Sequence, residues 1–193
     1  MDNWVVIFVR TGTEEKIINI LKTKLDGEIF VPFLPTREEV LKKESAWQKY
    51  IKPLFPGYIF VQALIEPKFI ADELNKVLEG LRASYPFIRL LHYGEDRRNI
   101  LVHEDERNFL EKILDDNYCV TVSKGFKVNE KIHITQGPLV GHEDAIKKIV
   151  RYQRKAYLDI EFAGELCELK LAIEIIGENS LTTGINSGER PKI

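Results

Sequence analysis

The C-terminal third of the chain alternates apolar and polar residues one by one, which limits how it can fold. The apolar positions are Ala156, Leu158, Ile160 and Phe162 and, after a turn at 163–165, Leu169, Leu171, Ile173 and Ile175. A period of two is typical of half-buried antiparallel strands, whereas a helix needs about 3.6 residues per turn. With a further short strand at 131–135 and a turn at 136–138, the pattern predicts a small all-β barrel over residues 125–178 and argues against a helical hairpin there.

The first 116 residues mix strand and helix patterns instead. Residues 4–9 are continuously apolar and rich in β-branched and aromatic types, as in a strand buried on both faces. The other expected elements are helices at 14–25, 67–80 and 103–115 and strands at 28–34, 58–61 and 88–93. The order β-α-β-β-α-β-α predicts an α+β domain, with a mixed sheet and flanking helices, over residues 1–116.

Three polar segments fall outside these elements. Residues 117–124 are bounded by polar turns, and we interpret them as a linker. Residues 179–193 are polar and contain glycine and proline, so we expect a disordered tail. Residues 36–52 are highly charged, with Trp47 and Tyr50 among lysines, and predict a protruding hairpin or a mobile loop.

Charge and cysteine content limit the chemistry. The 193 residues include 28 basic and 30 acidic side chains, and the net charge of −2 excludes a uniformly basic nucleic-acid coat but not a local basic patch. Cys119, Cys167 and the four histidines lack the spacing of a disulfide framework or a zinc site, so no metal or cofactor is expected. The sequence has no phosphate-binding loop, nucleophile motif or acid–base pair, so nothing in it argues for an enzyme. The apolar run at 4–9 is too short for a signal peptide or membrane span, and we expect a cytoplasmic protein.

A cluster of cations marks the middle of the predicted barrel. Residues 147–155 contain Lys147, Lys148, Arg151, Arg154 and Lys155, with Tyr152 among them. One interpretation is a solvated turn whose charges keep a sheet edge soluble. The other is an RNA contact in which the cations meet phosphates and Tyr152 stacks on an unpaired base.

One ten-residue stretch is specific enough to indicate a family. Residues 52–61, KPLFPGYIFV, resemble the FPGYVFV core of NusG-type N-terminal domains. Residues 4–6 and 30–32 match the WYVV and VP positions of that family in the same order, and residues 128–140 resemble a KOW motif. The resemblance covers roughly residues 3–178 and implies an NGN-like domain followed by a KOW barrel.

The NusG-type family consists of transcription elongation factors whose N-terminal domain docks on the clamp of RNA polymerase. The polymerase-binding residues that the resemblance implies are Trp4, Val5, Leu54, Phe55, Pro56 and Tyr58. We expect Phe55 and its neighbours to form an exposed apolar edge, and segment 36–52 is a candidate contact to polymerase or upstream DNA. In ordinary members a loop reading IFG contacts the ribosome and Rho; it reads Phe162-Ala163-Gly164 here, which makes both contacts doubtful.

Three departures from the ordinary pattern resemble a specialised branch. Val5 replaces a tyrosine, Asp144 stands at the second KOW glycine, and residues 147–155 are basic where ordinary members are often acidic. These features are most similar to the LoaP antiterminators, which bind an RNA hairpin in an operon leader. The implied RNA-binding residues are Lys147, Lys148, Arg151, Tyr152, Arg154 and Lys155, with Lys127 and His133. The prediction is a monomeric processive antiterminator without membrane contact; the alternative is a stand-alone KOW-type RNA-binding or ribosome-associated module that does not bind polymerase.

Overall fold

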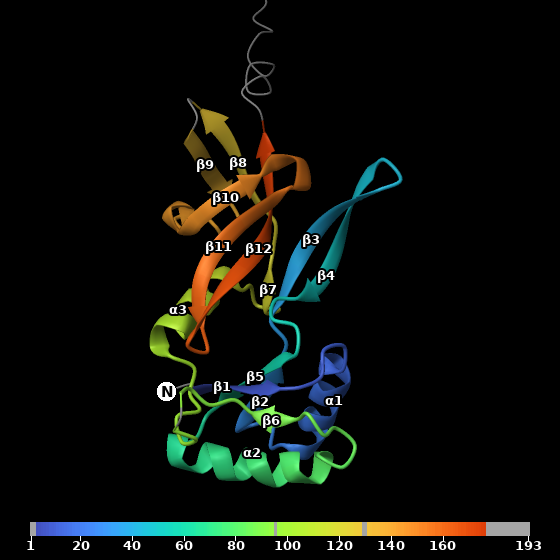
Figure 1. Ribbon diagram of the computed structural model, residues 1–193, viewed down its shortest axis with the longest axis vertical. Helices are drawn as coiled ribbons and strands as arrows, with labels where there is room; N and C mark the ends of the chain where they lie inside the picture. The colour runs from blue at the N-terminus through green and yellow to red at the C-terminus, as the bar shows by residue number, and fades with distance from the viewer. Residues whose placement is uncertain (1–2, 95, 129–130, 177–193) are drawn as a thin grey trace, which may run out of the picture.

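The computed structural model describes residues 3–94, 96–128 and 131–176, and the predicted disordered tail at 179–193 lies outside them. Figure 1 shows an N-terminal α+β domain below a C-terminal β domain. The N-terminal sheet has the order β2-β5-β1-β6. Its strands are β1 (Asn3–Phe8), β2 (Phe30–Phe33), β5 (Tyr58–Ala63) and β6 (Arg89–Leu90).

This sheet is antiparallel in all three of its pairings rather than mixed. Helix α1 (Glu14–Lys24) joins β1 to β2, and α2 (Pro67–Leu81) joins β5 to β6. Each helix therefore connects two strands that run parallel to one another without being neighbours. Strand β5 lies between β2 and β1, and β1 lies between β5 and β6. The α+β fold is confirmed, with its parallel strands separated.

The continuous apolar run of β1 is buried on both faces, as expected. Val5 and Ile7 point toward α1 and α2, where they pack in one core with Ile17 and Leu74. Trp4 and its neighbours on the opposite face belong to a second core, shared with α3 (Glu104–Ile113) and the C-terminal domain. The run is therefore apolar throughout because one face meets the domain's own helices and the other meets the rest of the chain.

Segment 36–52 is a hairpin and not a mobile loop. Strands β3 (Thr36–Lys43) and β4 (Ala46–Pro53) pair along their whole length. Glu44 and Ser45, which join them, have φ angles of 49° and 70°, as the tight turn of a hairpin requires. Strand β3 also pairs in parallel with β7 (Cys119–Val120). The segment 117–124 that we interpreted as a linker thus contains β7 and the start of the next strand.

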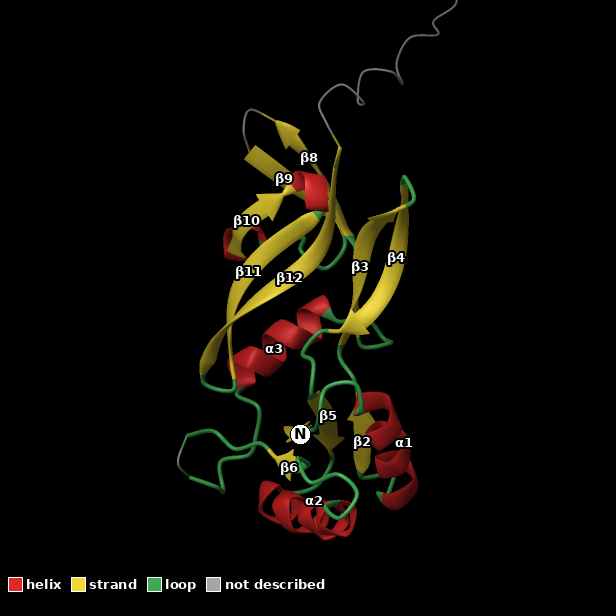
Figure 2. Cartoon of the chain, turned by 45° about the vertical axis from the view of Figure 1, so that its right-hand side comes forward, coloured by secondary structure: helices red, strands yellow, loops and turns green. Residues whose placement is uncertain are grey.

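The C-terminal domain is an all-β, barrel-like sheet of order β10-β11-β12-β8-β9, as predicted. Its strands are β8 (Ser123–Val128), β9 (Lys131–Gln136), β10 (Ile146–Val150), β11 (Lys155–Phe162) and β12 (Glu165–Ile176). Short 3-10 turns, η1 (Glu143–Ala145) and η2 (Arg151–Gln153), precede and follow β10. Leu158, Leu169 and Leu171 are almost fully buried, as their alternation indicated. Figure 2 shows the β3–β4 hairpin standing beside β12 of this sheet.

Candidate functional site

A buried carboxylate fixes the turn of the FPGY signature. Glu14, only 4% exposed, opens α1 and accepts hydrogen bonds from the backbone N–H groups of Gly57 (2.7 Å) and Gly12 (2.6 Å). Gly57 has a φ of 87°, and a Cβ atom there would lie 3.1 Å from the carbonyl oxygen of Val9. The turn therefore requires glycine, and it leaves Pro56 exposed beside the buried Phe55.

We expect Glu14→Gln to lower the free energy of unfolding by about 2 kcal/mol, since one accepting oxygen becomes an amide that faces a backbone N–H donor. Urea unfolding followed by circular dichroism measures the change. Glu15→Gln is the matched control, because Glu15 is the exposed neighbour on the same helix. Equal unfolding free energies for the two variants would contradict this role of Glu14.

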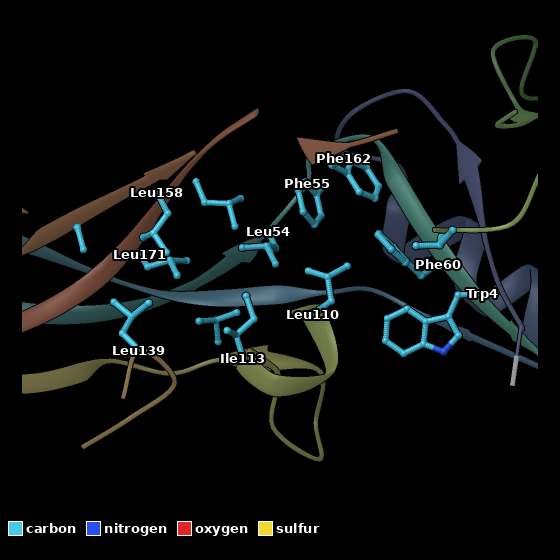
Figure 3. Close-up of a cluster of buried hydrophobic side chains, with 14 of the residues drawn as sticks. Trp4, Leu54, Phe55, Phe60, Leu110, Ile113, Leu139, Leu158, Phe162 and Leu171 are labelled. Carbon is cyan, nitrogen blue, oxygen red and sulfur yellow. The ribbon is translucent and has the colours of Figure 1, made fainter. Parts of the chain in front are cut away.

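Four aromatic rings form one surface of the N-terminal domain, which we call the aromatic face: Trp4, Phe33, Phe55 and Phe60. The ring centroids of Trp4 and Phe33 are 5.0 Å apart, and those of Phe55 and Phe60 are 5.9 Å apart. Figure 3 shows Trp4, Phe55 and Phe60 beside Leu54, with Leu110 and Ile113 of α3 close by.

Phe162, at the end of β11, covers the aromatic face. Its ring stacks on Phe55 with a centroid distance of 4.4 Å and an interplanar angle of 18°, and it lies 5.6 Å from Phe60. Phe55 is consequently 6% exposed and Phe162 3% exposed. The expectation that Phe55 forms an exposed apolar edge is wrong for this conformation, because the C-terminal domain supplies the ring that buries it.

The remaining predicted polymerase-binding residues occupy different positions. Trp4 and Leu54 are buried in the same core as Phe55. Tyr58 is half-buried and meets the Phe162 ring edge-on at 5.8 Å. Val5 points to the opposite side of the sheet, toward α1 and α2, so it is not part of the aromatic face.

Open space flanks the contact between the two domains. A groove of about 320 Å³ lies between α3 and β11, and a larger one of about 600 Å³ has Pro56, Tyr58 and Phe162 among its lining. On the wall of the smaller groove, buried Glu106 accepts a hydrogen bond of 2.5 Å from the Tyr93 hydroxyl. Burial, and then this hydrogen bond, raise the pKa of Tyr93 far above its usual range. The two grooves border the core that the aromatic face and α3 share with the C-terminal domain.

The five cations of residues 147–155 divide into paired and unpaired groups. Lys147 forms an ion pair with Asp159 (2.8 Å), Arg154 with Glu174 (2.7 Å) and Lys155 with Glu39 (3.0 Å). Lys148 and Arg151 are exposed and form no ion pair with any other residue that the structure describes. Tyr152 is 78% exposed. Strands β10 and β11 pair antiparallel as a hairpin, joined by η2.

Lys127 and His133 lie on β8 and β9, at the other end of the sheet order from β10. The ring of His133 stacks on Phe126 with a centroid distance of 5.5 Å. The structure thus brings six of the eight predicted RNA-binding residues together around η2 and places these two elsewhere in the sheet order.

The β3–β4 hairpin contacts residues 147–155, which we call the basic turn. The sequence analysis did not predict this contact. The carboxylate of Glu39 forms ion pairs with Lys155 at 3.0 Å and with Lys52 at 2.6 Å. The guanidinium of Arg154 lies 4.3 Å from the ring centroid of Trp47. Burial raises the pKa of Glu39, but its interactions with the ammonium groups of Lys52 and Lys155 outweigh burial and hold that pKa below its usual range. The unusual aromatic content of segment 36–52 was the available signal, but it does not identify a partner.

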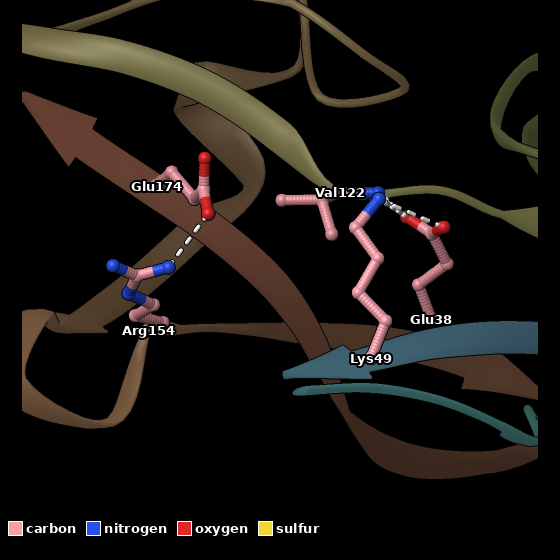
Figure 4. Close-up of polar contacts among 5 residues, drawn as sticks. All are labelled: Glu38, Lys49, Val122, Arg154 and Glu174. Carbon is pink, nitrogen blue, oxygen red and sulfur yellow. Dashed lines mark hydrogen bonds and ion pairs between the residues drawn. The ribbon is translucent and has the colours of Figure 1, made fainter. Parts of the chain in front are cut away.

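Glu38 connects the same hairpin to the start of the C-terminal domain. Its carboxylate accepts a hydrogen bond of 2.8 Å from the backbone N–H of Val122 and forms an ion pair of 3.0 Å with Lys49. Figure 4 shows these contacts together with the Arg154–Glu174 pair.

In the described ranges no helix has the length and apolar character needed to span a membrane. Across the same residues, no three His, Cys, Asp or Glu side chains are grouped as a metal would need.

Comparisons with known proteins give a consistent result. A family model described as "Transcription termination factor nusG" matches residues 2–110. The "Transcription termination/antitermination protein NusG" of Thermus thermophilus is 24% identical over 155 residues, covering 76% of this chain and 82% of that protein. The protein of the same description from Halalkalibacterium halodurans is 20% identical over 174 residues, covering 88% and 94%.

A solved structure, "Domain interaction in Thermotoga maritima NusG", aligns with a TM-score of 0.45 at 16% identity and covers 89% of this chain and 94% of that one. The family assignment rests on the sequence match, which spans more than half of the chain and includes the FPGY turn and the aromatic face. This chain belongs to the NusG family of transcription termination factors.

Proposed function

We propose that this protein is a processive antiterminator that binds RNA polymerase through its N-terminal domain and a leader RNA hairpin mainly through its C-terminal domain. It acts in the cytoplasm, as a monomer and without catalysis, in the manner of the specialised LoaP paralogs. The family membership supports a role in transcription, and the aromatic face supports a protein-binding surface on the N-terminal domain.

The aromatic face is the observation that carries the proposal. A cluster of aromatic rings at a surface is typical of protein interfaces, where such rings supply most of the binding energy. Here the FPGY turn adds Phe55 to that cluster, and the ring of Phe162 from the C-terminal domain covers Phe55. Polymerase binding then requires Phe162 to leave Phe55, so that the partner replaces the cover.

Support for the RNA contact comes from the unpaired side chains around η2. Lys148 and Arg151 are available to phosphates, and the exposed ring of Tyr152 is available to an unpaired base. Lys147, Arg154 and Lys155 are held by carboxylates of this chain, so RNA contact with them has to compete with those ion pairs.

Capture of purified core RNA polymerase on the immobilised full-length protein tests the polymerase half of the proposal. We expect Pro56→Asp to reduce capture at least tenfold, because Pro56 is exposed at the rim of the aromatic face and a buried unpaired carboxylate is costly at an interface. Phe69→Asp is the matched control, since Phe69 is 49% exposed on α2, which covers the other face of the sheet. Phe162→Ala removes the ring that covers Phe55. If neither wild type nor this variant captures polymerase, the alternative of a stand-alone RNA-binding or ribosome-associated module replaces this proposal.

A further inference from the structure

The basic turn and the N-terminal hairpin lie side by side, although about a hundred residues separate them in the sequence. Lys155 reaches Glu39 across this junction, and Arg154 covers the Trp47 ring. Figures 1 and 2 both show the β3–β4 hairpin beside the C-terminal sheet. Two segments with lysines and exposed aromatic rings therefore form one surface.

Charge is concentrated in these two segments. Residues 36–53 and 147–155 together hold ten of the chain's 28 basic residues and three of its 30 acidic ones, a net charge of +7. The rest of the chain consequently carries −9, which gives the total of −2. A protein that is acidic elsewhere and strongly basic at one junction is suited to an anionic polymer at that junction and not elsewhere.

The side chains of the junction have two roles. Arg154 and Lys155 hold the two halves together through Trp47 and Glu39. The cations of a second group are exposed and form no ion pairs with other described residues: Lys42 and Lys43 on the hairpin, and Lys148 and Arg151 on the turn. We call these four cations the joint basic surface, together with two rings: Tyr152, and Trp47, which Arg154 contacts but which is still 37% exposed. The cations that hold the halves together are thus distinct from those available to a ligand.

The chemistry of the joint basic surface favours single-stranded RNA. Its four cations are suited to phosphates, and each half adds one exposed ring on which a base can stack. A duplex keeps its base faces inside the stack and offers none to Trp47 and Tyr152. An acidic protein would use the four cations but gives no reason for a ring in each half.

The geometry points to a composite RNA site, in which the β3–β4 hairpin of the N-terminal domain and the η2 turn of the C-terminal domain bind the same unpaired nucleotides of one RNA loop. This inference rests on the proposed function, which places RNA contact mainly in the C-terminal domain, and adds the N-terminal hairpin as its second half. Lys42 and Lys43 bind phosphates, and Trp47 stacks on a base.

Fluorescence anisotropy with the full-length protein tests the composite site. The probe is a labelled pool of RNA hairpins with a randomised loop; the stem alone and the DNA hairpin pool of the same sequence are the comparison ligands. We expect Lys148→Ala/Arg151→Ala and Lys42→Ala/Lys43→Ala each to weaken RNA binding on the order of tenfold at physiological salt, and to reduce the salt slope by between about one and two units. Lys22→Ala/Lys24→Ala removes two exposed cations from α1 and is the matched control, with unchanged affinity expected.

Trp47→Leu removes the ring, and with it the contact to Arg154, without changing the net charge. We expect it to weaken RNA binding about tenfold, and Trp47→Phe to restore most of the loss, because a stacked base needs a ring and not a charge. Urea unfolding of each variant shows whether the fold is retained.

The outcomes distinguish the composite site from the function on which it rests. If wild type binds none of the RNA pool, the RNA-binding half of the proposed function and the composite site fail together. If the turn variant loses affinity while the hairpin variant matches the α1 control, only the composite site is overturned. Equal binding of the stem alone, or tighter binding of the DNA pool, would show that the surface does not select unpaired RNA.

Discussion

Phe162→Ala should release the C-terminal domain from the aromatic face and increase the capture of RNA polymerase. The Phe162 ring is 3% exposed and touches Phe55, Tyr58 and Phe60. Removing a buried phenylalanine ring typically costs about 3–5 kcal/mol. Since the rings that Phe162 touches all belong to the N-terminal domain, that cost shifts the balance between docked and separated domains by a factor on the order of 10² to 5 × 10³.

Two measurements check this result. Amide hydrogen exchange of residues 54–60 should become faster in Phe162→Ala, and polymerase capture should rise relative to wild type. Leu166→Ala is the matched control, because Leu166 follows the same β11–β12 turn but is 76% exposed and should change neither quantity. Faster exchange without greater capture would mean that the aromatic face is not where polymerase binds.

The sequence alone was sufficient for most elements but not for how the domains meet. The alternation in β11 and β12 shows that Phe162 faces the same side as Leu158, yet it does not reveal whether a second domain lies on that side. The apolar run of β1 correctly indicated burial on both faces, although the partner on one face comes from residues more than a hundred positions away. The periodicity of a sequence indicates which side of its own strand or helix a side chain faces. It cannot indicate domain docking, because docking depends on two surfaces.

The basic turn shows a similar limit for the candidate site. Counting cations located the cluster at 147–155, but it could not separate Lys155, whose partner Glu39 is 116 residues away, from the unpaired Lys148. The charged hairpin at 36–52 was recognised as unusual because it contains aromatic rings, and Trp47 is indeed in contact with Arg154. Pairing across the chain depends on tertiary structure, so the sequence identifies the charges and the structure assigns their partners.

Gly137→Ala should destabilise the C-terminal sheet by about 4 kcal/mol, because two costs combine there. Gly137 has a φ of 91°, a conformation that residues with a Cβ atom rarely adopt. A Cβ at this position would also lie 2.7 Å from the Cα atom of Ser123 and 2.9 Å from the carbonyl oxygen of Val122. Ser123 is fully buried and its hydroxyl accepts a hydrogen bond from the backbone N–H of Leu139, so the strand cannot move away without losing this contact.

Gly141→Ala separates the two costs. Gly141 also has a positive φ, 76°, but a Cβ there would meet no atom within 4 Å. Its replacement should therefore cost only the backbone strain, on the order of 1–2 kcal/mol. Urea unfolding of both variants, followed by circular dichroism, measures the difference between them as the contribution of the close approach to Ser123. If both variants lose a similar free energy of unfolding, then β8 shifts at Ser123 to make room for the added methyl group. The close approach of the Gly137 turn to Ser123 would then not contribute to the stability of this sheet.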